Sequence, residues 1–171
     1  MRDKKIIGMF GGKFLPLHEG HEYVISRAFD ECDIVYLCLF INGPEERRMK
    51  DAWYTNPDFR YYQLKKAAES RRRLQYKFYG RDVGYYILII DCQLFSKDGA
   101  EDWSAEANYI TRIAGHIDRV YSSEPGYDRF FRSAYKGAEH IIVDPKRETV
   151  PISSTKIRDM SDLDEQIRWM S

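Results

Sequence analysis

The stretch GMFGGKFLPLHEGHEYVI, residues 8–25, decides the fold, because an apolar run ends in it and a helical pattern begins. Gly11 and Gly12 directly follow the apolar run, Pro16 stiffens the turn, and we expect a helix to begin near Glu19. Glycines let backbone N–H groups approach an anion closely, and the first turn of a helix offers unpaired N–H groups and the positive end of its dipole. The stretch therefore predicts a phosphate-binding loop between a strand and a helix.

Three basic or imidazole side chains belong to the same stretch. His18 comes just before the expected helix and His21 lies three residues later, so both imidazoles are expected to face one bound anion. Lys13 adds a positive charge, and a triphosphate would suit such a site. A zinc site is the alternative, but its third ligand would have to be Glu19 or Glu22, whereas structural zinc usually has four Cys or His ligands. We therefore expect no metal held by the protein itself.

Composition limits the classes of function. The 171 residues include 27 Lys plus Arg and 27 Asp plus Glu, so no overall charge draws the chain to nucleic acid or to a membrane. Its length predicts a single domain covering residues 1–171. Cys32, Cys38 and Cys92 lie in or beside apolar runs without C-x-x-C spacing, which indicates reduced packing residues. Without a membrane-length apolar stretch or a signal-peptide pattern, we expect a cytoplasmic protein.

Apolar runs alternate with helical periodicity along the chain, which predicts a doubly wound α/β fold with a Rossmann-like five-stranded parallel sheet. The expected strands are mostly apolar throughout, as in strands covered on both faces, and cover residues 4–10, 33–41, 84–91, 118–123 and 139–144. The expected helices cover residues 19–31, 59–78, 102–114 and 126–137, with two short helices after 153. Residues 42–58 are expected to form a long loop.

A second segment that could bind phosphate is VPISSTKIRD, residues 150–159. Its hydroxyl side chains can cap a short helix, and its basic side chains add charge and a planar guanidinium donor. The residues concerned are Ser153, Ser154, Thr155, Lys156 and Arg158. An ordinary helix cap is the simpler interpretation of this segment. Together with residues 11–21, however, it predicts two helix N-termini that hold different phosphates of one nucleotide.

Both segments resemble signatures of a known superfamily. GGKFLPLHEGH is similar to the G-x-[FYW]-x-P-x-H-x-G-H signature of the nucleotidyltransferases, and ISSTKIRD to their C-terminal I-S-x-T-x-[IV]-R signature. Four further segments resemble the nicotinamide-mononucleotide adenylyltransferase domain of the NadR type: TNPDFRYY at 55–62, DW at 102–103, YSSEPGYD at 121–128 and GAEHIIVDPKRETVPISSTKIR at 137–158. The resemblance covers most of the chain and is weakest over residues 71–86.

The resemblance implies the nucleotidyltransferase fold and transfer of the adenylyl group of ATP to nicotinamide mononucleotide, which gives NAD and pyrophosphate. No general base is required, because the second pKa of a phosphate monoester is about 6 and the attacking phosphate is already largely ionised. The protein would hold the reactants in line and neutralise charge. Mg²⁺ is the implied cofactor, bound mainly through the phosphates of ATP.

Site residues follow from the same resemblance. The implied catalytic residues are His18, His21 and Lys13. ATP would be bound by Gly11, Gly12, Lys13, His18, Gly20, His21, Ser153, Ser154, Thr155 and Arg158. The nucleotide acceptor would be bound by Trp103, Phe14 and Arg147, with the indole of Trp103 stacked on the cationic pyridine ring. Packing of Trp103 under the loop after the third strand is the alternative.

Two other functions stay open at this point. One is a sister transferase that uses CTP or a pantetheine phosphate, and the other is a non-catalytic sensor of ATP or NAD. The segment RRRLQYKFYGR, residues 71–81, has five basic residues and no acidic one, but a solvated helix face explains it better than a nucleic-acid patch. The expected partners are therefore ATP and nicotinamide mononucleotide, without a membrane or nucleic acid, and the chain is compatible with a homo-oligomer.

Overall fold

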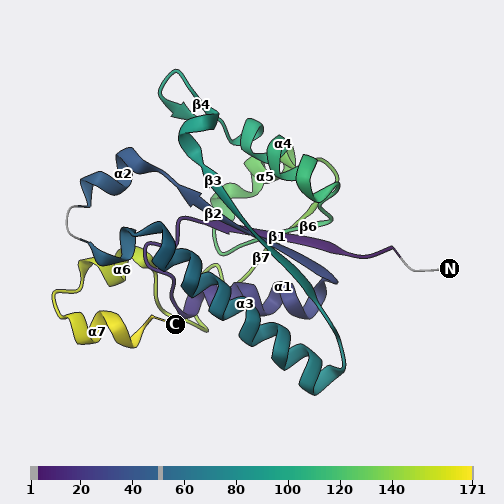
Figure 1. Ribbon diagram of the computed structural model, residues 1–171, viewed down its shortest axis with the longest axis horizontal. Helices are drawn as coiled ribbons and strands as arrows, with labels where there is room; N and C mark the ends of the chain where they lie inside the picture. Colours follow the sequence, from purple (N-terminus) through teal and green to yellow (C-terminus); the bar gives the residue numbers. More distant parts are fainter. Residues whose placement is uncertain (1–3, 50–51, 171) are drawn as a thin grey trace.

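A five-stranded parallel sheet forms the centre of the computed structural model, which describes residues 4–49 and 52–170 (Figure 1). Its strands lie in the order β3-β2-β1-β6-β7. They are β1 (Ile7–Gly12), β2 (Ile34–Ile41), β3 (Gly84–Asp91), β6 (Arg119–Ser122) and β7 (Glu139–Ile142). All five predicted strands are present, and the predicted doubly wound α/β class is confirmed.

The strand order places a crevice beside the first strand. The chain runs outward from β1 through β2 to β3 and then returns to place β6 on the other side of β1. Ligands of open parallel sheets bind outside the carboxyl ends of the strands, at the point where the strand order reverses. Gly11 and Gly12 are the last residues of β1, where they pair with Cys38 and Leu39 of β2, so the prediction that they follow the strand is wrong. The loop after β1 leads from them to His18 and His21, so the topology brings this stretch to this position.

Helices cover both faces of the sheet (Figure 1). One apolar core lies between the sheet and α1 (Glu19–Glu31) and α3 (Pro57–Tyr79). A second core lies between the opposite face and α4 (Trp103–Ala114) and α5 (Asp128–Ala134). Both faces of the central strands β1 and β2 are therefore buried, which explains why these strands are apolar throughout rather than alternating.

Helix ends follow local capping chemistry. The observed limits of α1 are those predicted. The long helix α3 begins two residues earlier than predicted, because Asn56 Oδ1 accepts hydrogen bonds from the backbone N–H groups of Asp58 and Phe59 while Pro57 occupies the first turn. Gly80 ends α3 in the left-handed conformation, with a φ of 64°.

The segment predicted as a long loop, residues 42–58, contains helical turns, so that prediction is wrong in part. It forms α2 (Gly43–Arg48), capped by the Asn42 side chain with Pro44 in the first turn, and the short 3-10 helix η1 (Trp53–Thr55). Residues 50 and 51 lie outside the described part of the chain. Asn42 is a good N-cap residue and could have indicated the start of α2. The Gly-Pro pair that follows it indicated a loop instead.

A small hairpin between β3 and α4 was also not predicted. It consists of the 3-10 helix η2 (Cys92–Phe95) and the two-residue strands β4 (Ser96–Lys97) and β5 (Ala100–Glu101). The predicted helix 126–137 is shorter than expected, because the 3-10 helix η3 (Pro125–Tyr127) comes before α5. The three predicted packing cysteines are buried and free, as expected.

Two short helices end the described chain, as predicted: α6 (Ser154–Asp159) and α7 (Leu163–Arg168). They lie beside one another in Figure 1, next to the beginning of α1. The backbone N–H of Glu19 donates to the carbonyl oxygen of Trp169, and His18 forms an isolated bridge with Met170. The C-terminal segment therefore packs against the same loop that follows β1.

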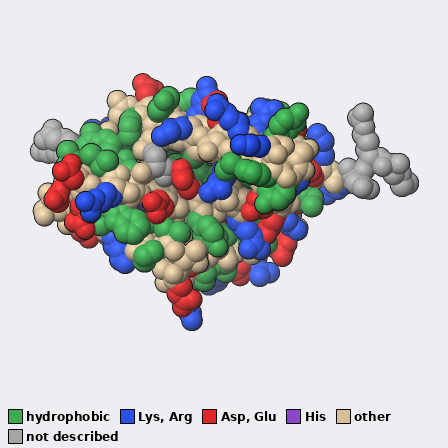
Figure 2. Space-filling model, turned by 90° about the horizontal axis from the view of Figure 1, so that it is seen from below, with side chains coloured by type: hydrophobic (Ala, Val, Ile, Leu, Met, Phe, Trp, Pro, Cys, Tyr) green, Lys and Arg blue, Asp and Glu red, His purple; other side chains and the backbone are tan. Residues whose placement is uncertain are grey.

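Figure 2 views the molecule from the side of α1 and α3, where basic, acidic and hydrophobic side chains are interspersed. Within the basic segment 71–81, Arg81 donates to the carbonyl oxygens of Asp30 and Cys32 at the end of α1. Arg72 is paired with Asp82. Part of this segment therefore stabilises the fold. No helix among residues 4–49 and 52–170 combines the length and apolarity needed to cross a bilayer.

Candidate active site

The two predicted phosphate-binding segments meet at the carboxyl end of the sheet. Ser154 Oγ donates to the carbonyl oxygen of Pro16 at 3.1 Å, and Arg158 Nη1 donates to that of Leu15 at 2.7 Å. Ser153 caps α6, as predicted, by accepting from the backbone N–H of Lys156. The N-terminal loop and the C-terminal helix thus form one structural unit.

Hydrogen bonds decide the protonation of the two histidines. His18 is the N-cap of α1, and its Nδ1 accepts from the backbone N–H of Gly20 at 3.0 Å. His21 Nδ1 accepts from the backbone N–H of His18 at 3.3 Å. A neutral imidazole whose Nδ1 accepts must carry its proton on Nε2. Both rings therefore have an Nε2–H donor, and they stack with centroids 3.8 Å apart.

Both histidines are held neutral. Burial, with a contribution from the charge of Arg147, lowers the pKa of His18 to about 4. Burial, His18 and Arg147 likewise lower the pKa of His21 well below its usual value. At pH 7 the pair therefore consists of two neutral hydrogen-bond donors, and positive charge at the site must come from arginine and lysine.

Glycine is required in this loop for packing. A Cβ on Gly20 would lie 2.8 Å from His18 Cε1, because the His18 ring folds back over the helix to accept the hydrogen bond from Gly20. A Cβ on Gly11 would lie 2.5 Å from the ring of Phe40. The glycine between the two histidines is thus part of the same capping arrangement that sets the imidazole tautomers.

The predicted free N–H groups at the start of α1 are not observed, and this part of the sequence interpretation is wrong. The N–H of Glu19 donates to Trp169, and that of Gly20 donates to His18 Nδ1. The N–H groups of His21 and Glu22 donate to the carbonyl oxygen of His18. The capping box and the C-terminal segment satisfy the N–H groups of residues 19–22, so these four backbone groups are not free to bind an anion.

Lys13 is held by carboxylates from two other elements. Its Nζ pairs with Glu45 of α2 and lies 3.4 Å from Glu101 Oε1 of β5. Burial by itself lowers the pKa of Lys13, but these two carboxylates outweigh it and leave the pKa above its usual value. Lys13 is therefore charged and lies between the loop after β1 and the hairpin after β3.

Arg60 of α3 is a positioning residue that the sequence analysis missed. Its side chain is fully buried, and its Nη1 donates to the carbonyl oxygen of Lys13 at 2.9 Å. Its Nη2 donates to Glu46 and to the carbonyl oxygen of Thr55. Arg60 thereby ties the phosphate loop to α2 and η1. The sequence did not indicate that Arg60 is buried, because an arginine in an amphipathic helix normally lies on its exposed face.

Arg147 lies near the histidine pair, as its effect on their pKa values shows. Its Nη1 donates to the carbonyl oxygen of Ile152 at 2.7 Å, and its backbone has a φ of 54°. Thr155 Oγ1 accepts from Arg158 Nη2 at 3.2 Å. Each arginine therefore donates one of its hydrogen bonds to a residue of the C-terminal signature.

The predicted acceptor-binding residues divide into two groups. Trp103 packs against the rings of Tyr127 and Phe130, and it lines a cavity of about 600 Å³ that also includes Glu101 and Phe130. Trp103 is therefore partly buried by aromatic packing and also borders the cavity. Phe14 is 2% exposed and packs edge-on against His21, so its burial favours positioning of the imidazole over contact with substrate.

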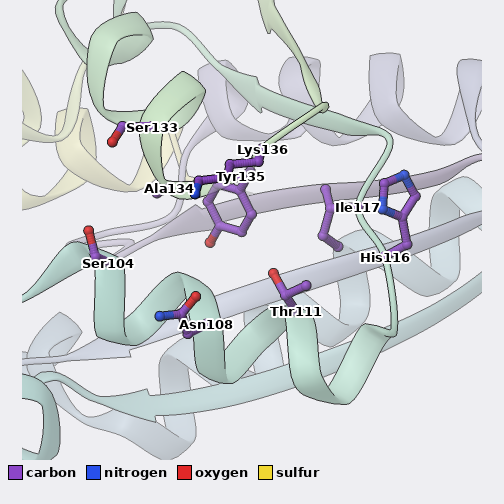
Figure 3. A pocket seen from close by; sticks show the side chains of 9 residues that line it. All are labelled: Ser104, Asn108, Thr111, His116, Ile117, Ser133, Ala134, Tyr135 and Lys136. Atoms are coloured by element: carbon purple, nitrogen blue, oxygen red, sulfur yellow. The ribbon is translucent and has the colours of Figure 1, made fainter.

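A second cavity, of about 450 Å³, lies between α4 and α5 (Figure 3). Ser104, Asn108 and Thr111 of α4 face residues 133–136 at the end of α5 across it. This cavity contains none of the residues of the two signatures. The two signatures meet instead at the loop after β1, and this junction is the candidate active site.

One further cluster has the connectivity of a hydrolytic triad. Ser122 Oγ lies 2.7 Å from His140 Nε2, and His140 Nδ1 lies 2.9 Å from Asp128 Oδ1. Ser122 and the His140 side chain are buried, and Ser122 Oγ also accepts from the backbone N–H of Glu124. Neither cavity described above includes Ser122, so these contacts join β6, β7 and α5 rather than present a nucleophile.

Comparison with known proteins agrees with this geometry. The family model described as cytidylyltransferase-like matches residues 9–160. The chain therefore belongs to the cytidylyltransferase-like family of the nucleotidyltransferase superfamily. The resemblance of its two signatures to that superfamily is thus confirmed.

Individual relatives narrow the comparison. The chain is 29% identical over 166 residues to the trifunctional NAD biosynthesis/regulator protein NadR of Escherichia coli K12, and 27% identical to that of Salmonella typhimurium. Each alignment covers 92% of this chain, which spans 37% of the length of each relative.

Solved structures share the fold. A NadR protein in complex with NAD and AMP-PNP has a TM-score of 0.56 at 18% identity, over 98% of this chain and 45% of that one. A bifunctional NMN adenylyltransferase/ADP ribose pyrophosphatase from Francisella tularensis also has a TM-score of 0.56, at 15% identity, over 91% of this chain and 41% of that one.

Proposed function

We propose that this chain transfers the adenylyl group of ATP to nicotinamide mononucleotide and releases NAD and pyrophosphate. The observation that carries the proposal is the junction of the two signatures, in which Ser154 and Arg158 bind the backbone of the loop that contains His18 and His21. Similarity to NadR proteins over most of the chain supports the choice of acceptor.

The proposed reaction is a direct displacement. An oxygen of the acceptor phosphate forms a bond to the α-phosphorus of ATP while the bond from that phosphorus to the bridging oxygen breaks. Pyrophosphate leaves with the electron pair. The acceptor phosphate is already ionised at neutral pH, so the protein has no proton to remove.

The protein contributes donors and charge. The two Nε2–H groups of His18 and His21 are preorganised donors for phosphate oxygens, because their Nδ1 atoms are fixed by backbone hydrogen bonds. Lys13, Arg147 and Arg158 supply the positive charge that the neutral imidazoles do not. The Trp103 ring at the 600 Å³ cavity is the proposed platform for the pyridine ring.

Mg²⁺ is part of the proposal and would neutralise charge on the triphosphate. The carboxylates beside Lys13 are already engaged, since Glu45 pairs with Lys13 while Glu101 accepts from Asn42 and lies near Lys13. Phosphate oxygens and water would therefore provide most of its ligands, as is common for this ion.

A substrate panel tests the function. The chain is incubated with Mg²⁺ and either ATP or CTP, against nicotinamide mononucleotide, nicotinate mononucleotide and a pantetheine phosphate, and products are identified by mass. We expect NAD and pyrophosphate from ATP with nicotinamide mononucleotide. CTP is included as the second nucleotide donor because the matching family model is described as cytidylyltransferase-like. Formation of a cytidylyl product would favour a sister transferase, and binding of ATP without any product would favour a nucleotide sensor.

A further inference from the structure

A cluster of three ligand-type side chains lies beside the proposed active site. Cys92 of η2, Glu101 of β5 and Glu106 of α4 each offer one atom, and these atoms all lie within 4.8 Å of one another. Ligands of one tetrahedral zinc ion lie roughly 3.5 Å apart, given metal–ligand distances of about 2.0 to 2.3 Å. The cluster is therefore close to the size that a single ion requires.

One buried oxygen without a partner points independently to a missing ligand. Glu106 is 6% exposed, its carboxyl group forms a hydrogen bond with the Cys92 thiol, and its Oε1 has no hydrogen-bond partner among the described residues. Cys92 is 1% exposed. A buried carboxylate oxygen without a partner costs free energy that a bound cation would recover. Glu106 reaches this position because it lies on the inner face of the first turn of α4.

Neighbouring groups orient the third ligand. Glu101 Oε1 accepts from Asn42 Nδ2 at 2.6 Å, and Glu101 also accepts a hydrogen bond from the indole of Trp103. Hydrogen bonds of this kind fix the orientation of metal-binding carboxylates. Lys13 lies 3.4 Å from Glu101 Oε1 but pairs more closely with Glu45, which offsets the lysine charge.

We propose that Cys92, Glu101 and Glu106 bind one thiophilic divalent cation, with Zn²⁺ as the favoured ion. The donor set of one sulfur and two carboxylates suits zinc and excludes Mg²⁺, which requires oxygen ligands. Three protein ligands leave a fourth position for water. This site is distinct from the histidine pair and from the Mg²⁺ that would accompany ATP.

Metal binding displaces the proton of the thiol. The S–H bond of Cys92 breaks, the sulfur keeps the electron pair and bonds to the metal, and the proton leaves to solvent.

The ion would join η2, β5 and the first turn of α4. The segment from η2 through β5 to the start of α4 borders the 600 Å³ cavity and carries Trp103. Metal binding would fix this segment against the end of β3. The proposal concerns metal binding, so its test does not depend on adenylyl transfer.

Cobalt is the probe for the test, because Co²⁺ bound to a thiolate gives a near-ultraviolet charge-transfer band that imidazole or carboxylate ligands do not give. The full chain is reduced with a phosphine, titrated with Co²⁺, and then challenged with Zn²⁺. We expect a band that saturates at one equivalent and disappears with equimolar Zn²⁺. Cys92→Ser should lose the band, and Glu106→Gln should bind Co²⁺ at least about 10-fold more weakly.

Cys32→Ser is the matched control. Cys32 is also buried and hydrogen-bonded, to Tyr121, but it lies in the apolar core on the other face of the sheet. Its variant should keep the wild-type band. A wild-type protein without a band, or a band that persists in Cys92→Ser, would overturn the proposal. In that case Cys92 and Glu106 form a protonated pair in the core.

Discussion

Arg158 and Leu15 are 143 residues apart in the chain and are joined by a 2.7 Å hydrogen bond from the guanidinium to a backbone carbonyl oxygen. The same guanidinium reaches Thr155 with its second nitrogen. One side chain of the C-terminal signature therefore holds the shape of the N-terminal signature. In the proposed reaction it also supplies positive charge beside the histidine pair.

Arg158→Ala should impair both functions of this residue. We expect kcat/KM for ATP to fall by an amount equivalent to about 2 to 4 kcal/mol, since a hydrogen bond to a charged group contributes about 1.5 to 3 kcal/mol and more than one is lost. Arg158→Lys should recover only part, because lysine keeps the charge but loses the planar fork. The measurements are steady-state kinetics and Tm.

Lys156→Ala is the control for these variants, because Lys156 lies on the same helix, is exposed, and has only one long contact, with the carbonyl oxygen of Pro151. It should change the free energy of unfolding by less than about 0.5 kcal/mol. Normal ATP kinetics in Arg158→Ala would remove the C-terminal segment from the active site.

The two histidines should respond differently to substitution. His21→Ala is expected to lower kcat by about 10² to 10³, because it removes one preorganised donor. His18→Ala should lower kcat and also destabilise the fold by about 0.5 to 2 kcal/mol, because His18 is the N-cap of α1. His18→Asn should restore stability without restoring kcat. Recovery of kcat in His18→Asn would contradict a donor role for the His18 imidazole.

Acid should destabilise the fold through His18. Its pKa lies at about 4 in the folded chain against 6.5 in the unfolded chain, so the unfolded state binds more protons between these values. Stability is therefore present above pH 6.5 and is lost as the pH falls toward 4. The loss is at most about 3 kcal/mol, since one pKa unit is worth about 1.4 kcal/mol.

Urea unfolding of the wild type and of His18→Asn at pH 7.5, 6 and 5 measures this effect. The difference between the two proteins cancels Glu106, whose raised pKa of about 7 acts with the opposite sign. The pKa values of Asp118 and Asp144 are lowered from 3.8, so these carboxylates change the free energy of unfolding only near and below pH 3.8, outside the range from pH 5 to 7.5. A difference that is independent of pH would refute a neutral, buried His18.

Arg60 should be essential to the loop, because its fully buried guanidinium donates to the backbone of that loop at Lys13. Arg60→Met leaves Glu46 and two carbonyl groups without their partner, and we expect a loss of about 3 to 5 kcal/mol in the free energy of unfolding. Arg73→Ala on the exposed face of α3 should cost less than about 0.5 kcal/mol. Chemical denaturation of both variants makes the comparison, and a small effect of Arg60→Met would show that α2 holds the loop without it.

Local patterns in the sequence predicted the architecture. The five strands and α1 were identified because long apolar runs and helical periodicity are properties of neighbouring residues, and both cores bury these positions. Because these patterns involve only neighbouring residues in longer segments, the analysis missed α2 and the hairpin of β4 and β5. The cap at Asn42 was hidden by the glycine and proline after it, and the two-residue strands β4 and β5 are too short to show periodicity.

The two signatures were also visible in the sequence, and they place residues 11–21 and 152–158 in one kind of site. Only the tertiary structure decided what those residues do there. The proton on each Nε2 follows from backbone hydrogen bonds, and the first turn of α1 is satisfied because Trp169 packs against it. Buried Arg60 and the cluster of Cys92, Glu101 and Glu106 join elements distant in the chain. Such contacts depend on how helices and loops meet across the sheet, and a linear pattern does not carry that information.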